Sequence, residues 1–165
     1  MKKSLLLFCL LFSASIVMAQ AYKSSAGLRL GYPVAATYKT FISENAALEG
    51  IVGFGSYSRY VGYTNIRAAY LIHQDLEVES ISNLQWYYGG GAGVFIWSYN
   101  DFYYGERASA TAFGLSGYLG LEYTFSDIPL VLSLDWAPTI IVGGFGGGFG
   151  AGYGALAARY IIGRE

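Results

Sequence analysis

The sequence predicts an all-β fold, namely an eight-stranded antiparallel up-and-down transmembrane β-barrel that follows a cleaved signal peptide. Three observations support this prediction. Hydrophobic residues make up 54% of the 165 residues. Charged residues make up only 13%, and this share is about half that of an ordinary soluble domain. Apolar residues alternate with polar or small ones along most of the chain, which is the period of a β-strand. The charged residues within these segments fall on the less apolar face.

The composition excludes several other classes of protein. Aromatic residues make up 18% of the chain, whereas disordered chains are polar and poor in aromatics. The composition also argues against a coiled coil, which is rich in Ala, Glu, Lys and Leu. The formal net charge of −1 offers no basic surface for nucleic acid. We therefore expect no nucleic-acid partner.

The first residues have the layout of a secretory signal peptide. Lys2 and Lys3 form a short basic start, and residues 4–18 form an apolar run. Val17 and Ala19 supply the small residues that precede a cleavage site. The alternative is a membrane anchor helix, which needs about 20 apolar residues. We therefore expect residues 1–19 to be a signal peptide cleaved after Ala19, and residues 20–165 to form one barrel domain.

The remaining chain divides into strands joined by turns. No later stretch has 18 apolar residues free of charges and Gly clusters, so a second membrane helix is not expected. The clearest alternation runs from Phe113 to Phe125, and the turn at 126–129 separates it from the next alternating segment. The predicted strands are 25–32, 35–42, 46–57, 63–73, 84–99, 111–125, 130–142 and 152–163. An even number of strands places both chain ends on the same side of a barrel.

Seven of these strands each contain a single charged residue near the middle, opposite the apolar face. These residues are Arg29, Lys39, Glu49, Arg67, Glu122, Asp135 and Arg159. Their signs nearly balance, so they can pair inside a narrow barrel. We expect them to form an ion-pair network that fills the lumen; the alternative is that some of them face lumen water separately.

The fifth strand contains no such charge, and its apolar face is predicted to contain Trp86, Tyr88, Val94 and Ile96. Its opposite face then contains Gly89, Gly91 and Gly93. Glycines at these positions make room for long Arg and Lys side chains from other strands.

The polarity of the two faces distinguishes two kinds of barrel. A soluble lipocalin-like barrel has apolar residues inside and a charged outer surface. A membrane barrel has apolar residues toward lipid and polar residues toward the lumen, because a charge facing lipid at mid-bilayer costs roughly 2–4 kcal/mol. One charge per strand is too few for a soluble outer surface, so the pattern favours the membrane barrel.

Aromatic residues are expected to form two belts at the lipid–water interfaces. The belt at the end near Asn100 contains Tyr57, Tyr60, Tyr63, Trp97, Tyr99, Phe102, Tyr103 and Tyr104. The belt at the opposite end contains Phe41, Tyr70, Trp86, Tyr88, Tyr123, Phe125 and Tyr160.

Few residues have the chemistry of a catalytic or metal site. Cys9, the only cysteine, lies in the predicted signal peptide, so no thiol remains for a disulfide or a nucleophile. His73 is the only histidine, and we expect it at a strand end, on a turn with Asp75, Glu77 and Glu79, without the partners of a catalytic dyad. This acidic turn is predicted to be solvated, with weak divalent-cation binding as the alternative. We expect no enzyme activity, no cofactor and no metal site.

The Gly-rich run at 143–150 is predicted to be a flexible outer loop. It is not a phosphate-binding loop, because no Gly-Lys-Ser/Thr sequence and no helical pattern follow it. A surface ligand or partner site in this loop is the alternative.

Six segments together resemble a known family. They are Gly27-Leu28-Arg29-Leu30-Gly31, Tyr38-Lys39-Thr40-Phe41, Ala47-Leu48-Glu49-Gly50, Trp86-Tyr87-Tyr88-Gly89-Gly90-Gly91, Leu134-Asp135-Trp136-Ala137-Pro138 and Ala158-Arg159-Tyr160. In this order they resemble small outer-membrane β-barrels of the OmpX and OmpA-membrane-domain type, and especially the "outer membrane protein beta-barrel domain" proteins of Gram-negative bacteria. The resemblance covers the chain after the signal peptide. It implies that the chain ends and tight turns face the periplasm, whereas the other loops face outward.

The resemblance also implies insertion by the outer-membrane assembly machinery, which recognises the last strand. Many members of the family end on an aromatic residue, whereas this chain ends in Ile161-Ile162-Gly163-Arg164-Glu165. Tyr160 is the candidate substitute for that aromatic residue.

The expected function is that of a monomeric, non-enzymatic integral outer-membrane barrel with a structural or surface-interaction role. Its expected partners are outer-membrane lipid, lipopolysaccharide and the assembly machinery. The alternatives are a narrow pore, a barrel that binds a small apolar solute, and a soluble secreted lipocalin-like binding protein. The candidate surface residues are Arg59, Asp101, Tyr103, Tyr104, Glu106 and Arg107.

Overall fold

The computed structural model describes residues 22–58, 60–78, 81–100, 107–144, 147–150 and 153–163. The predicted signal peptide, residues 1–19, lies outside these ranges. Among the described residues, no helix is long and apolar enough to cross a membrane. The strands are β1 Ser24–Gly31, β2 Val34–Phe41, β3 Ala46–Ser58, β4 Val61–Asp75, β5 Leu84–Asn100, β6 Arg107–Thr124, β7 Leu130–Trp136, β8 Thr139–Gly143, β9 Gly148–Gly150 and β10 Gly154–Gly163.

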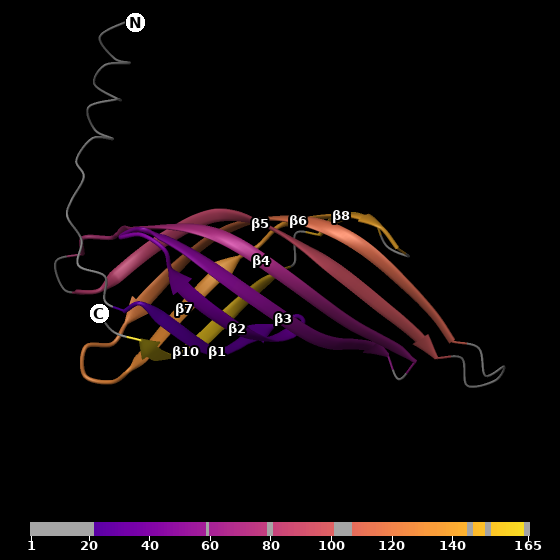
Figure 1. The fold of residues 1–165 in the computed structure, drawn as a ribbon, viewed down its shortest axis with the longest axis horizontal. Coiled ribbons are helices and arrows are strands. Elements are labelled where there is room, and N and C mark those ends of the chain that lie inside the picture. The colour runs from indigo at the N-terminus through magenta and orange to yellow at the C-terminus, as the bar shows by residue number, and fades with distance from the viewer. Residues whose placement is uncertain are drawn as a thin grey trace, which may run out of the picture.

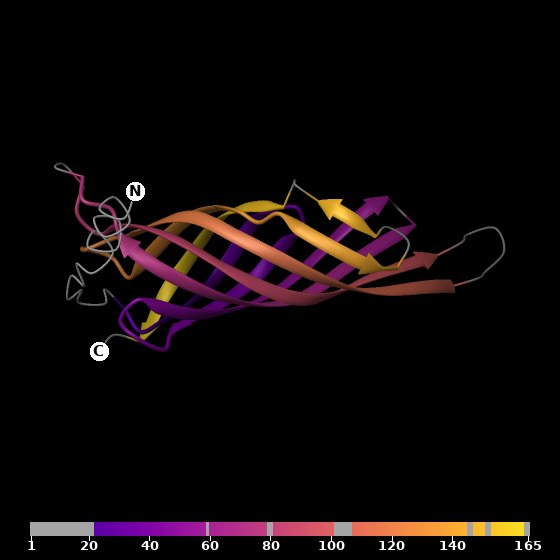
Figure 2. The same ribbon diagram turned by 90° about the horizontal axis from the view of Figure 1, so that it is seen from above.

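Eight strands close into an antiparallel barrel, as the sequence predicts. Strands β1 to β6 each pair with the next along the chain, and β10 pairs with both β7 and β1. These pairings close the ring, and two perpendicular views show the barrel wall from the side (Figure 1, Figure 2). Ser24 of β1 pairs with Gly163 of β10, so both ends of the barrel sequence lie at the same rim. We call this the terminal rim, and the other the distal rim.

The seventh predicted strand, 130–142, is interrupted in the structure. It divides into β7 and β8 at Ala137 and Pro138, because proline has no N–H for a sheet hydrogen bond. The Pro138 carbonyl still accepts a hydrogen bond from the Gly117 N–H at 3.0 Å, so β6 holds both halves of the strand. After β8, Gly143 and Gly144 have φ angles of 91° and 69°, a conformation that favours glycine.

The strands differ in length, which makes the distal rim uneven. Strands β1 and β2 have 8 residues each, whereas β4, β5 and β6 have 15, 17 and 18. Because of this difference in length, the β5–β6 hairpin extends well beyond the short β1–β2 hairpin (Figure 1, Figure 2). For comparison, a tilted strand crosses a bilayer with about 9–11 residues. The short strand β9 lies within residues 143–150, the run predicted to be a loop, and it pairs with β8. The loop prediction is therefore wrong for residues 148–150.

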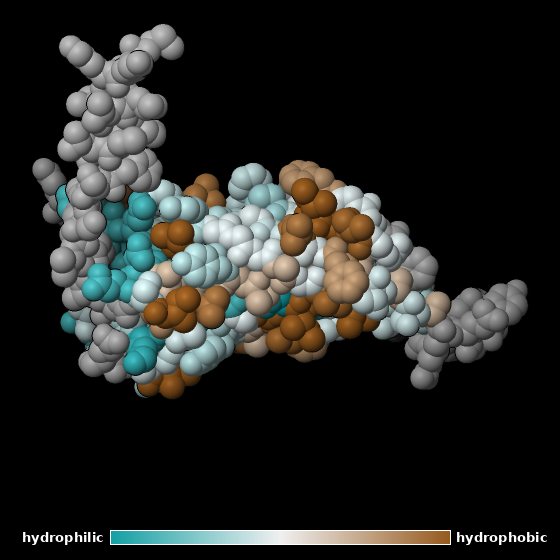
Figure 3. Space-filling model, turned by 45° about the horizontal axis from the view of Figure 1, so that its top comes forward, coloured by the Kyte–Doolittle hydropathy of each residue, from teal (hydrophilic) through white to brown (hydrophobic). Residues whose placement is uncertain are grey.

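The charged residues of the strands lie inside the barrel, whereas its outer wall is apolar. Buried and exposed residues alternate along the strands, and all seven mid-strand charged residues are buried in the interior. Large apolar side chains face outward instead; Phe113, Leu115 and Val142 are 68%, 67% and 69% exposed. Figure 3 shows apolar side chains over the outer wall, whereas hydrophilic residues gather mostly at the terminal rim. This polarity is the inverse of that in a soluble protein.

The fifth strand has the orientation that the sequence predicts. Tyr87, Phe95 and Trp97 of β5 are buried in the interior, whereas Tyr88 and Gly90 are exposed on the outer face. A Cβ placed on Gly93 would lie 2.5 Å from the Cγ atom of Arg67. This glycine therefore makes room for a long cationic side chain, as expected.

Three of the aromatic residues assigned to interface belts lie inside the barrel. Phe41, Tyr63 and Trp97 are buried, so their assignment to the lipid interface is wrong. Trp86, Tyr123 and Phe125 are half-buried. The belt residues that are exposed on the outer face are Tyr60, Tyr70, Tyr88, Tyr99 and Tyr160. The side chains of Tyr57, Phe102, Tyr103 and Tyr104 lie outside the described part of the chain.

Candidate functional site

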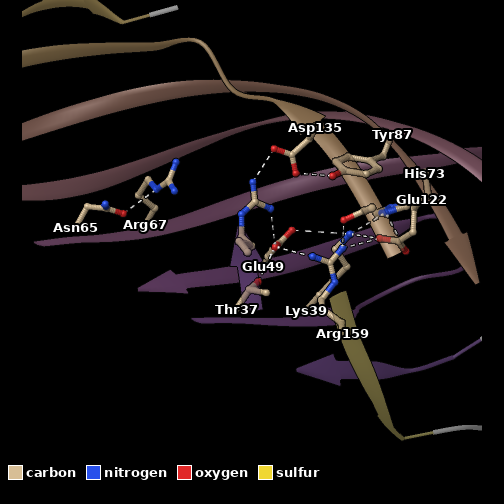
Figure 4. A network of polar contacts seen from close by, with 12 residues as sticks. Thr37, Lys39, Glu49, Asn65, Arg67, His73, Tyr87, Glu122, Asp135 and Arg159 are labelled. Atoms are coloured by element: carbon tan, nitrogen blue, oxygen red, sulfur yellow. Dashed lines mark hydrogen bonds and ion pairs between the residues drawn. The ribbon is translucent and has the colours of Figure 1, made fainter. Parts of the chain in front are cut away.

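A cluster of buried, oppositely charged side chains occupies the middle of the barrel (Figure 4). Its members come from β1, β2, β3, β6, β7 and β10, and each points inward because of the two-residue period of its strand. We define the charge cluster as Arg29, Lys39, Glu49, Glu122, Asp135 and Arg159. It contains three cations and three carboxylates, so its formal charges balance.

Glu49 forms one centre of the charge cluster. Its Oε1 atom lies 3.1 Å from Nη1 of Arg29 and 3.2 Å from Nη1 of Arg159. Thr37 donates a further hydrogen bond to the same oxygen, at 2.6 Å. Arg29 also binds Asp135 Oδ1 through its Nη2 atom, at 2.6 Å. Glu49 and Arg29 therefore link strands that are not neighbours in the sheet.

Glu122 forms the second centre. Its Oε2 atom lies 2.7 Å from Lys39 Nζ and 2.7 Å from Arg159 Nη2. Tyr22 donates a hydrogen bond to Oε1 at 2.7 Å. Arg159 contacts both carboxylates, so it joins the two centres. Since a buried ion pair needs its remaining polar atoms satisfied, these extra donors are part of the same arrangement.

Neutral side chains complete the charge cluster. Tyr87 donates a hydrogen bond to Asp135 Oδ2 at 2.7 Å, and its ring lies 4.5 Å from Lys39 Nζ in a cation–π contact. Ser133 accepts a hydrogen bond from Arg159 Nη2 at 2.8 Å. Tyr22, Thr37, Tyr87 and Ser133 were not expected at the site. The strand period alone indicates three of them, because Thr37, Tyr87 and Ser133 share faces with Lys39, Gly89 and Asp135.

His73 lies inside the barrel, and our expectation of a turn position is wrong. The strand β4 continues to Asp75, and His73 is buried within it, on the same face as Arg67. Its Nε2 atom lies 3.3 Å from Lys39 Nζ and 3.8 Å from Glu122 Oε1. Its ring is 5.0 Å from that of Tyr87. His73 therefore borders the charge cluster.

Apolar side chains enclose the charge cluster from both rims. Toward the terminal rim they are Tyr22, Phe41, Ala47, Val131 and Ile161. Toward the distal rim they are Tyr63, Phe95, Trp97, Ala112 and Ile141, with Tyr153 packed against them. An eight-stranded barrel is only just wide enough for its side chains to fill. The interior is thus a packed core with charged groups in the middle.

Arg67 is placed apart from the charge cluster. Ala69, two residues away, pairs with Glu49, whereas Arg67 pairs with Ile51, closer to the distal rim. Its Nε atom donates a hydrogen bond to Asn65 Oδ1 at 3.0 Å. Among the described residues Arg67 forms no ion pair (Figure 4). The structure thus groups six of the seven charged residues that we expected in one network.

The candidate surface residues lie at the edges of the described ranges or outside them. Arg59, Asp101, Tyr103, Tyr104 and Glu106 lie outside the described residues. Arg107 is the first residue of β6, and its side chain is not among those that the structure describes.

The described residues provide no grouping of three His, Cys, Asp or Glu side chains that would hold a metal ion. The three carboxylates of the charge cluster each contact at least one cation. The arrangement therefore binds strands to one another.

Comparison of the chain with known proteins finds no matching family model, no matching curated protein and no matching solved structure.

Proposed function

We propose that this chain is a non-enzymatic, integral outer-membrane β-barrel, whose lumen is closed by its own side chains and whose role is structural or surface-interacting. The observation that supports this most strongly is the polarity of the closed barrel. Charged side chains are buried inside, and large apolar side chains cover the outside. Such a surface is stable where its surroundings are lipid.

The outer wall is apolar all the way round. The exposed large hydrophobic residues come from every strand of the barrel. On a typical soluble monomer, by contrast, the largest apolar patch covers only about 300–600 Å². No charged side chain in the middle of a described strand faces outward. Placing one there would cost roughly 2–4 kcal/mol in a bilayer. Both features disfavour the soluble lipocalin-like alternative.

The filled interior supports a closed barrel over a narrow pore. The charge cluster is enclosed by an apolar layer toward each rim, which favours a lumen filled by side chains over a water-filled path. In this proposal the barrel is a monomer that contacts outer-membrane lipid and lipopolysaccharide. The assembly machinery inserts it after cleavage at Ala19, and the distal rim faces the exterior.

Cell fractionation combined with gel mobility tests the membrane assignment. The protein should separate with the outer membrane, resist extraction without detergent, and migrate differently on a denaturing gel before and after boiling, because a closed barrel resists unfolding by detergent. Recovery from the soluble periplasm, with the same mobility in both samples, would contradict the proposal.

Electrical recording in planar bilayers tests the closed lumen. The purified barrel should give no steady single-channel openings, since the charge cluster blocks the path. Regular openings that scale with salt concentration would instead favour the narrow pore.

A further inference from the structure

Within the part of the chain that the structure describes, one buried cation, Arg67, has no anionic partner. The charge cluster balances three cations with three carboxylates, so Arg67 leaves the interior with one excess positive charge. Arg67 is only 6% exposed. Its Nε atom donates a hydrogen bond to Asn65 Oδ1, and among the described residues it forms no ion pair with a carboxylate. An unpaired buried charge is strongly destabilising.

Two further polar groups near Arg67 are also unsatisfied. The Nδ2 atom of Asn65 is buried without an acceptor, and so is the hydroxyl group of Tyr118. Tyr118 packs in one apolar cluster with Ala137 and Tyr153. A guanidinium, an amide N–H₂ and a phenol can all donate hydrogen bonds. The acceptor that contacts Arg67, Asn65 Oδ1, is neutral, and the surroundings supply further donors.

A small cavity is lined by Arg67. Its walls also include Arg29, Pro33, Ala137 and Tyr153, and about 10 Å³ of it is open to the centre of a water-sized sphere. Such a cavity accommodates about one water molecule or monatomic ion. It has no carboxylate among its lining residues, and two of those residues are arginines. Phosphate, with four oxygens, is too large for it.

From this geometry we propose that Arg67 holds one halide-sized anion, such as chloride, inside the barrel. The anion would neutralise the excess charge and accept hydrogen bonds from Arg67, which lines the cavity. Chloride suits the cavity because it is monatomic and monovalent. A water molecule would satisfy the donors but leave the charge unbalanced. The inference concerns the barrel interior and does not depend on the proposed membrane location.

Diffraction from crystals of the whole barrel grown in bromide tests the site directly. Bromide replaces chloride, and its anomalous signal distinguishes it from water. We expect an anomalous peak within about 3.5 Å of the Arg67 guanidinium, at hydrogen-bond distance for a large anion. Density without an anomalous signal at that position would identify water and overturn the proposal.

Unfolding experiments in detergent provide the functional test. At constant ionic strength, sodium chloride should raise the unfolding temperature of the wild type by about 2 °C or more relative to sodium gluconate, because gluconate is too large to bind and a ligand of the native state raises its stability. Arg67→Met should abolish this difference. The matched control Lys23→Met, which removes an exposed cation, should retain it.

The proposal fails if chloride and gluconate give equal unfolding temperatures in the wild type, or if Arg67→Met keeps the chloride effect. If Arg67→Met does not fold, the bromide experiment on the wild type decides.

Discussion

The charged side chains of the interior act as cross-links between strands that are far apart in the sequence. Arg159 of β10 contacts Glu49 of β3 and Glu122 of β6, and all three side chains are almost wholly buried. Removing one partner of such a group leaves the others desolvated and uncompensated. The stability of the barrel should therefore depend on single residues of the charge cluster.

Glu122→Gln tests this dependence. The substitution removes the carboxylate charge that lies 2.7 Å from both Lys39 and Arg159, and it should lower the free energy of unfolding by about 3–5 kcal/mol. The measurement is urea unfolding of the folded barrel in detergent, followed by tryptophan fluorescence.

Asp75→Asn is the matched control for this substitution. Asp75 is an exposed carboxylate at the end of β4 that accepts a hydrogen bond from Gln85 at 2.9 Å, so its neutralisation should cost at most about 1 kcal/mol. If the two variants lose equal stability, the charge cluster does not hold the barrel together.

The sequence predicts the direction of a side chain better than its depth. The two-residue period indicates which residues face inward, and it places Arg67 on the same side as the six residues of the charge cluster. It does not indicate the stagger between strands, and this stagger puts Arg67 opposite Ile51 instead of Glu49. His73 was misplaced for a related reason, because the end of β4 was predicted two residues too early.

At the scale of the strand, β5 depends on its glycines. In the run at 89–93, Gly89, Gly91 and Gly93 face the crowded interior, whereas Gly90 faces outward. A Cβ on Gly93 would lie 2.5 Å from Arg67 Cγ and 2.6 Å from the Ile66 carbonyl oxygen. A Cβ on Gly90, on the outer face, would lie 3.8 Å from its nearest neighbour, the Ser116 carbonyl oxygen.

Gly93→Ala should therefore destabilise the barrel by about 1–3 kcal/mol, which is typical of overpacking. Gly90→Ala should be neutral or stabilise it slightly, because alanine reduces the freedom of the unfolded chain. Urea unfolding of the two variants beside the wild type provides the comparison. Equal losses would show that the crowding between β4 and β5 has no energetic effect.

Strand boundaries were predictable where turns are short and alternation is regular. The break between β7 and β8 was not predicted, although Pro138 marks it, because β6 continues to pair with the chain on both sides of the break. The belt assignment failed for Tyr63 and Trp97 because it did not apply the two-residue period, which places Tyr63 on the inward face of Arg67 and Trp97 on that of Gly93. Aromatic side chains there pack against one another inside the barrel, with ring centroids 5.4 Å apart.

For the whole molecule, the low charge content and high hydrophobicity of the sequence have one structural explanation. The charges are gathered in the interior, and the apolar residues that alternate with them cover the outer wall. The proposed environment of that wall is lipid. The sequence alone indicates the wall's polarity, whereas closure of the ring follows from pairing between strands that are distant in the chain, such as β1 and β10.

The most direct test of this account places a polarity-sensitive fluorescent label on the outer wall. After residue 19 the chain has no cysteine, so Leu115→Cys and Asp127→Cys each provide one labelling site. Leu115 lies on the apolar wall in β6, and Asp127 lies in an exposed turn at the terminal rim. In vesicles of brominated lipid, the label at 115 should emit at shorter wavelength and be quenched by the bromine, whereas the label at 127 should show neither effect. If the label at 115 behaves like the one at 127, the outer wall does not face lipid.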